Sequence, residues 1–383
     1  MKISKKNSSG SLKLASIDAI RGWAIFLVII SHTGGAFAEL PWRIKAMTNL
    51  GWFGVQLFFL ASAFTLVMSW RRQEGSYWRK FTKFFIRRFF RIAPMYYFGC
   101  LLYFLIRPPL DNFSFEQLAA SLVFLNAWSP QYMTTLNDAW QVVPGGWSIG
   151  VEFSFYLIFP FLILFVTSLS RSIIFFLLSL VLAFLSYYFG LDYYENIYGY
   201  DAAEKFMFFW LPSQLGIFSL GFILYFFSHS QHHVINMLKQ VLSKYALFIY
   251  LSGVALVLVY AQVGTNKHFS GLFPWLPAHY IVSFVFLLFT VLMLEKDFSI
   301  LVNPAIVKLG QVSFSAYIIH FSIIQVFHNL ELIESTGIIS ILYFGLVLTL
   351  VTVITFVIST LTYNFIELPF VRLGQLLTKK ISA

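Results

Sequence analysis

Apolar stretches of about 20 residues recur along the chain and are separated by short polar or charged segments. A helix of about 20 apolar residues is long enough to cross the hydrocarbon core of a bilayer. We therefore expect an all-α integral membrane protein with about ten transmembrane helices in one bundle. The expected spans are residues 17–37, 49–69, 93–107, 147–167, 172–190, 206–227, 245–263, 277–294, 309–329 and 338–361. The stretch 117–127 is too short to cross and is expected to form a re-entrant or interfacial segment.

The composition supports this expectation. Hydrophobic residues make up 59% of the chain and charged residues 11%, and the mean hydropathy is +0.77. Soluble domains are about half apolar and a quarter charged. Too much apolar surface is present to be buried in water, so lipid must surround most of the chain.

The positions of Lys and Arg predict the orientation. Cytoplasmic loops of membrane proteins carry an excess of these residues. With a cytoplasmic N-terminus, 21 of the 26 Lys and Arg residues lie on the inner side. We therefore expect a multi-pass protein of the bacterial cytoplasmic membrane with both termini in the cytoplasm. Residues 1–16 and 371–383 are the expected cytoplasmic tails, and residues 17–370 form one transmembrane domain.

The net charge of +10 is thus primarily a topology signal, and the sequence gives little support for nucleic-acid binding. A single cysteine, Cys100, excludes an intramolecular disulfide. No metal site is expected, because His232 and His233 have no third ligand nearby in the sequence. Membrane lipids are the expected surroundings, and the oligomeric state is not predicted.

The first span carries polar residues that lipid should exclude, and such residues are functional candidates. Arg21 lies at its cytoplasmic start, and His32 follows eleven residues later, about 16 Å along the same helix face. Asp18 lies one turn before Arg21 and could pair with it.

Two further spans place ionisable residues at depth. Glu152 is expected about 8 Å below the outer surface in the fourth span, and His320 about 18 Å from the cytoplasmic side in the ninth. These two residues and His32 could therefore line one polar cavity. The alternative is that each is a single buried polar group that serves packing, and for His320 the two interpretations are equally supported.

A basic run precedes the third span and predicts a basic amphipathic cytoplasmic helix. Lys83, Arg87 and Arg91 repeat at intervals of four, with Arg88 adjacent. Part of this run is expected to lie on anionic lipid headgroups. Arginine forks also suit phosphates, so the run is a candidate site for a phosphate-rich cytoplasmic ligand.

Small residues follow in the second span, where Gly51, Gly54 and Ser62 would let helices approach closely in lipid. In the ninth span, Ser313 lies seven residues before His320 and shares its face. For these residues, packing is the favoured role.

Six segments occur in one order along residues 16–370: IDAIRGWAI with His32, GWFGVQLFFLASAF, FFIRRFFRIAPMYY, GGWSIGVEFSFY, GQVSFSAYIIH and IELP. In these segments the chain resembles the membrane acyltransferase-3 family, whose bacterial members O-acetylate lipopolysaccharide O-antigens, capsules, exopolysaccharides and Nod factors. One departure is Ala63, where the family usually has glycine. No hydrolase-like domain is appended, so the resemblance implies a stand-alone transferase module.

The resemblance implies an acyltransferase that uses acetyl-CoA or another short acyl-CoA and a hydroxyl of a saccharide or lipid-linked saccharide. The family's Arg-x10-His positions correspond to Arg21 and His32, and its basic motif to Arg87, Arg88 and Arg91. We expect these arginines and Lys83 to bind the coenzyme A phosphates. Glu367 of the IELP segment is expected to support the fold.

Neutral imidazole suits removal of a hydroxyl proton, so His32 is the expected general base. Glu152 would orient His32 or position the acceptor hydroxyl, and Trp147, Ser148 and His320 would contact the acceptor. Direct transfer is favoured over an acyl-enzyme, with Ser148 as the one candidate nucleophile.

A proton-coupled transporter of a sugar or small anion is the alternative, since buried His and Glu residues also form proton relays. Against it, the sequence shows no internal repeat of the kind that many transporters have. A structural scaffold explains the buried ionisable residues less well.

Overall fold

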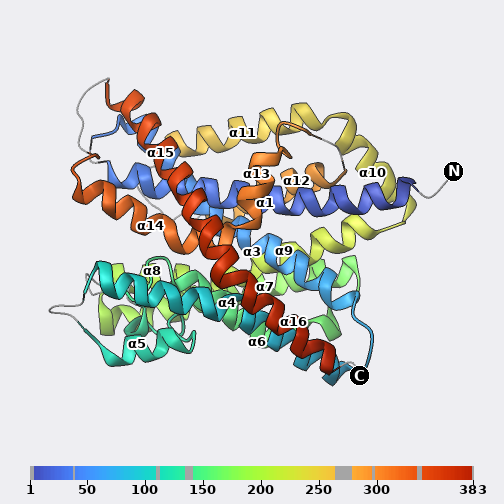
Figure 1. The fold of residues 1–383 in the computed structure, drawn as a ribbon. Coiled ribbons are helices and arrows are strands. Elements are labelled where there is room, and N and C mark those ends of the chain that lie inside the picture. The colour runs from blue at the N-terminus through green and yellow to red at the C-terminus, as the bar shows by residue number, and fades with distance from the viewer. Residues whose placement is uncertain are drawn as a thin grey trace. The chain divides into compact units, whose positions relative to one another are not determined.

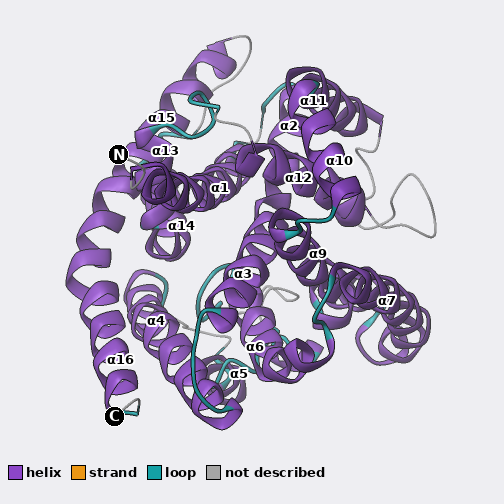
Figure 2. Ribbon diagram, turned by 90° about the vertical axis from the view of Figure 1, so that its right-hand side faces the viewer, coloured by secondary structure: helices purple, strands orange, loops and turns teal. Residues whose placement is uncertain are grey.

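A computed structural model describes residues 4–37, 39–108, 113–133, 141–263, 278–295, 298–333 and 339–381. Within these ranges every regular element is helical, as the sequence predicts (Figures 1 and 2). Eight helices are long and apolar enough to cross a membrane, or ten if each of two bent helix pairs counts as one span. The prediction of an all-α membrane protein is therefore confirmed, and about ten spans is the upper end of this range.

Contacts within the chain group it into two compact units. The first is formed by the chain up to Ser62 and by Ile223–Ser359. Its helices are α1 (Ser4–Ala36), α2 (Trp42–Asn49), η1 (Leu50–Phe53), the first half of α3 (Gly54–Arg71), the end of α9 (Leu211–His229), α10 (His233–Lys244), α11 (Ala246–Val263), α12 (Ala278–Glu295), α13 (Pro304–Gln311), α14 (Ser313–Asn329) and most of α15 (Ile339–Thr362).

Helix α1 is the centre of the first unit. It packs against α2, η1, α12, α13 and α14. Two long-range hydrogen bonds fix it there: Ser16 Oγ donates to the Met293 carbonyl at 3.1 Å, and Trp23 Nε1 donates to the Leu301 carbonyl at 2.9 Å. Because α1 carries Arg21 and His32, this packing determines which elements surround those two side chains.

Glycines bring α1 and α13 into backbone contact. A Cβ atom at Gly310 would overlap the carbonyl oxygen of Asp18, and one at Gly22 would overlap that of Ile306. Helix α13 then bends by 86° into α14, which carries His320. Small residues commonly allow such close approach between helices in lipid.

The second unit is formed by Ala63–Phe222 and Thr360–Ala383. It contains the rest of α3, α4 (Tyr77–Ile106), α5 (Phe115–Leu122), η2 (Pro130–Tyr132), α6 (Trp147–Phe165), α7 (Leu169–Tyr198), α8 (Tyr200–Phe209), the start of α9, the π-helical turn η4 (Tyr363–Glu367) and α16 (Leu368–Lys380). Helix α16 lies beside α4 (Figures 1 and 2), and α8 packs against α7.

Several segments differ in extent from the sequence pattern, among them α4, α5 and the C-terminal segment. The basic run and the third span form one continuous helix, α4, with Pro94 inside it. Proline is tolerated in membrane helices because neighbouring groups can satisfy the backbone that it frees. The short stretch expected at 117–127 is a helix, α5, followed by a turn. The expected C-terminal tail is helical as far as Lys380 and contributes the buried residues Gly374 and Thr378.

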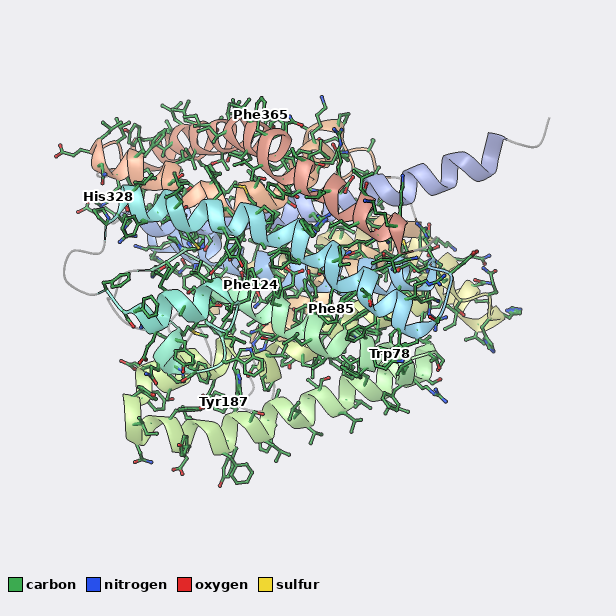
Figure 3. The ribbon with its side chains drawn as sticks, turned by 60° about the horizontal axis from the view of Figure 1, so that its bottom comes forward. Trp78, Phe85, Phe124, Tyr187, His328 and Phe365 are labelled. Atoms are coloured by element: carbon green, nitrogen blue, oxygen red, sulfur yellow. The ribbon has the colours of Figure 1, made fainter. Side chains whose placement is uncertain are left out.

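Aromatic side chains mark the elements of the second unit in Figure 3. Trp78 and Phe85 belong to the N-terminal half of α4, Tyr187 to α7, and Phe124 to the turn after α5. The Phe124 ring stacks on Phe153 of α6 with centroids 3.7 Å apart. This contact fixes the short α5 segment against α6, the helix that carries Glu152.

Candidate active site

Two histidines from distant parts of the sequence meet inside the first unit. His32 projects from α1 and His320 from α14, and their ring centroids are 5.4 Å apart. The ring of Phe321 lies 4.3 Å from His32 and 4.2 Å from His320, so the three rings contact one another. Trp52 of η1 adds a fourth ring 6.1 Å from His32.

The two imidazoles have different surroundings. His320 is completely buried, and its Nδ1 lies 3.2 Å from the carbonyl oxygen of Ala316, one turn earlier in α14. Its Nε2 is also buried and has no hydrogen-bond partner among the described residues. His32 is half-buried. His32 is therefore the more accessible of the two imidazoles, while His320 stays inside the protein.

The remaining α1 candidates lie near its N-terminal half. Arg21 is half-buried, and the Asp18 carboxylate accepts a hydrogen bond of 3.4 Å from Gln311 Nε2 of α13. A Cβ atom at Gly51 or Gly54 would overlap a carbonyl oxygen of α1, so both glycines lie directly against that helix. Ser62 and Ser313 are buried.

Glu152 lies in the second unit, within a polar group formed by α4 and α6. Tyr156, one turn later on α6, donates a hydrogen bond of 2.5 Å to Glu152 Oε1. The Arg88 guanidinium of α4 lies 5.9 Å from the centre of the Tyr156 ring and interacts electrostatically with Glu152. The structure therefore places Glu152 beside a phenol and an arginine.

The basic residues of α4 face different neighbours. Arg87 Nε donates to Thr378 Oγ1 of α16 at 3.2 Å, whereas Arg88 faces Tyr156 of α6. Lys83 is buried and Arg91 is half-buried. The cations that the sequence groups together thus belong to one helix but not to one surface, because residues 87 and 88 project about 100° apart around a helix.

The expected acceptor residues of α6 lie at its N-terminus. Trp147 is buried, with its ring 4.3 Å from that of Phe209. Ser148 is buried, and its hydroxyl donates to the Gly145 carbonyl at 3.0 Å. Glu367 in the π-helical turn is 2% exposed.

Several contact residues were not singled out from the sequence, among them Phe321, Tyr156 and Thr378. Tyr156 could have been found, because it lies four residues after Glu152 and so shares its helix face. Phe321 is adjacent to His320, but adjacent residues on a helix point in different directions, so its contact with both histidines depends on packing. Thr378 lies 291 residues from Arg87, and no local pattern joins them.

Within the described residues, no group of three or more His, Cys, Asp or Glu side chains is arranged to hold a metal ion. The polar groups near His32 and Glu152 are instead imidazoles, a phenol, a carboxylate and a guanidinium. Such groups can accept protons, donate hydrogen bonds and bind anions.

Residues 14–360 match a protein-family model described as an acyltransferase domain. An acyltransferase of Streptomyces mycarofaciens, MdmB, is 28% identical over 159 residues, which is 39% of this chain and 39% of that protein. A Staphylococcus aureus (strain COL) protein that is provisionally named an O-acetyltransferase is 23% identical over 385 aligned residues, 94% of this chain and 58% of that protein. The chain thus spans less than two thirds of the length of these relatives. No solved structure shows significant similarity.

Proposed function

This chain belongs to the acyltransferase domain family, and from that premise we propose that it moves an acetyl or other short acyl group from acyl-CoA to a hydroxyl of a cell-surface saccharide or its lipid-linked precursor. The family match and the apolar helices support a multi-pass membrane acyltransferase. The observation that carries the proposal is the contact between His32 and His320 inside the first unit. We propose the bacterial cytoplasmic membrane as its location, with both termini in the cytoplasm.

The proposed reaction is direct transfer with His32 as general base. A ring nitrogen of His32 takes the proton of the acceptor hydroxyl as its oxygen attacks the thioester carbonyl. The tetrahedral intermediate collapses when the carbon–sulfur bond breaks, and the His32 imidazolium returns the proton to the departing coenzyme A sulfur. Imidazole is suited to both steps because its ordinary pKa is about 6.5.

The proposed donor site uses cations. Coenzyme A carries phosphates, and charge-assisted hydrogen bonds from arginine bind phosphate strongly. Lys83, Arg87, Arg88 and Arg91 on α4 are the proposed ligands within the second unit. Arg21 of the first unit is a further candidate, proposed from the sequence resemblance alone. Because Arg88 also faces Tyr156 and Glu152, it would additionally hold the Glu152 carboxylate in place.

Replacing Arg87 and Arg91 together by alanine is expected to weaken acetyl-CoA binding by about 10²–10⁴-fold, because hydrogen bonds to charged groups contribute about 1.5–3 kcal/mol each and two are lost. The dissociation constant of purified protein in detergent, measured by calorimetry, is the test. Thr378→Val is the matched control: it removes the partner of Arg87 on α16 but leaves the arginine charge in place. An unchanged acetyl-CoA affinity in the double variant would identify this segment of α4 as a lipid anchor only.

Glu152 is proposed to align the acceptor hydroxyl, with Trp147 and Ser148 of the same helix as acceptor contacts. His320 of the first unit is proposed as an acceptor contact from the sequence alone. Tyr156→Phe removes the hydroxyl that holds the Glu152 carboxylate and is expected to lower the rate of transfer about tenfold, as loss of a charge-assisted hydrogen bond predicts. Glu152→Gln should lower it further. Transfer of label from acetyl-CoA to glycans of cells that express each variant measures both effects.

Acetyl-CoA affinity should stay unchanged in Tyr156→Phe and Glu152→Gln, since the proposed role concerns the acceptor. A loss of acetyl-CoA binding equal to the loss of transfer would show that Glu152 acts on the donor side instead.

The function itself is tested by two measurements on the wild-type protein. Acetyl-CoA should raise the melting temperature of the purified protein, because a ligand that binds the folded state stabilises it. Mass spectrometry of surface glycans from cells with and without the gene should show an ester group that depends on the gene. Absence of both effects would refute the proposal.

A further inference from the structure

The backbone of α14 determines which nitrogen of His320 carries the proton. Nδ1 lies 3.2 Å from the Ala316 carbonyl oxygen. A carbonyl oxygen can only accept a hydrogen bond, so Nδ1 must be the donor in this contact. In the neutral ring, Nε2 then carries the lone pair and can only accept. This acceptor is the buried Nε2 atom that has no partner among the described residues.

The spacing of the two rings fits a hydrogen bond between them. A nitrogen–nitrogen hydrogen bond of about 2.9 Å, between nitrogens that each lie about 1.2 Å from their ring centres, places the centres about 5.3 Å apart. This value applies when both nitrogens lie on the line between the ring centres, and the observed separation of 5.4 Å is close to it. We expect rotation of the half-buried His32 ring to direct one of its N–H groups at His320 Nε2.

We propose that His320 is the positioning residue for His32: its Nε2 accepts a hydrogen bond from one ring nitrogen of His32 and leaves the other nitrogen unprotonated, as a base requires. When that base takes the hydroxyl proton, the His32 imidazolium keeps the hydrogen bond to His320. The inference rests on the proposed function, in which His32 is the base. It gives His320 a role beyond contact with the acceptor.

Catalytic histidines are commonly oriented in this way. A hydrogen bond to one ring nitrogen determines whether the other nitrogen carries a proton. Here the orienting group is a neutral imidazole, fixed in turn by a backbone carbonyl. Phe321 contributes as well, because its ring lies 4.3 Å from the His32 ring and its π-electrons favour a nearby cation. Both contacts stabilise His32 more when it is charged than when it is neutral.

Two substitutions of similar size separate this role from packing. In His320→Gln, the side-chain amide oxygen can reach the place of Nε2 and still accept a hydrogen bond. In His320→Met, a side chain of the same length fills the space but offers only a weak acceptor. The Gln variant should keep transfer within about tenfold of wild type, whereas the Met variant should lose about 10²-fold or more, as loss of an orienting partner does.

The loss in His320→Met should be in kcat, with KM for acetyl-CoA and the melting temperature close to those of the Gln variant. Equal transfer by the two variants would overturn the inference and leave His320 a packing residue. If His32→Ala loses activity while His320→Gln and His320→Met transfer at equal rates, only the inference about His320 is refuted. Activity retained in His32→Ala would refute the proposed base itself.

A spectroscopic measurement on the wild-type protein keeps the inference testable even if neither variant folds. Ile319–His320 is the sole Ile–His step in the sequence, so carbonyl-labelled isoleucine with nitrogen-labelled histidine assigns the His320 signals in solid-state NMR of the protein in lipid. We expect a protonated Nδ1 and an unprotonated Nε2. A protonated Nε2 with an unprotonated Nδ1 would overturn the inference.

Discussion

Replacing His32 by alanine is expected to lower acyl transfer by about 10²–10⁴-fold, the range over which a general base contributes. The reason is that the substitution removes the one half-buried imidazole of the His32–His320 pair, the member that can reach a bound hydroxyl. Incorporation of label from acetyl-CoA into surface glycans measures the effect. Acetyl-CoA affinity should change little, because the base acts on the acceptor hydroxyl.

His328→Ala is the matched control for this prediction. His328 also lies on a helix of the first unit, near the end of α14, but its side chain is exposed (Figure 3). The His328→Ala variant should therefore transfer acyl groups at the wild-type rate. Transfer by His32→Ala close to that of His328→Ala would contradict the assignment of His32 as base, provided that both proteins are present in the membrane in equal amounts.

Replacing Gly310 by alanine is expected to cause the largest loss of stability. The added Cβ atom would overlap the Asp18 carbonyl oxygen, and neither backbone can move without shifting α1 against α13. Overpacking of this kind costs about 1–3 kcal/mol, and more where the backbone is rigid. The melting temperature in detergent, and the yield of membrane-inserted protein, should both fall.

Gly345→Ala on α15 is the matched control, since the substitution is the same and also lies in a helix of the first unit. No atom lies within 4 Å of the Cβ atom that it adds. Alanine has a higher helix propensity than glycine by about 1 kcal/mol, so this variant should be as stable as wild type or more stable. Equal melting temperatures for the two variants would show that the contact between α1 and α13 can relax.

The candidate site could be predicted in part from the sequence. The spacing of Arg21 and His32 puts both on one helix, and the depth of His320 in its span matches that of His32. These expectations use only helix rise and span position, which are local properties. The expectation that Glu152 joins His32 in one cavity stays a prediction, because the structure places Glu152 in the second unit, with Tyr156 and Arg88.

The basic run illustrates the limit of local patterns. Its spacing predicts a helix with cations along one side, and Tyr77–Ile106 does form one helix, α4. The pattern does not reveal that Arg87 bonds to Thr378 while Arg88 faces α6. That difference arises because α16, from the other end of the chain, packs on one side of α4.

The sequence by itself determined that this protein is helical and crosses a membrane, because the length and apolar character of each segment fix how it is solvated. It also predicts which polar residues lie within the spans, since this follows from their position in each apolar segment. Only the tertiary structure decided which of them meet. Lipid does not drive helices together through the hydrophobic effect, so their pairing depends on close packing between specific side chains and glycines. The contact of Gly310 with Asp18 and that of His32 with His320 depend on how the helix surfaces fit together. The order of polar and apolar residues along the chain does not reveal them.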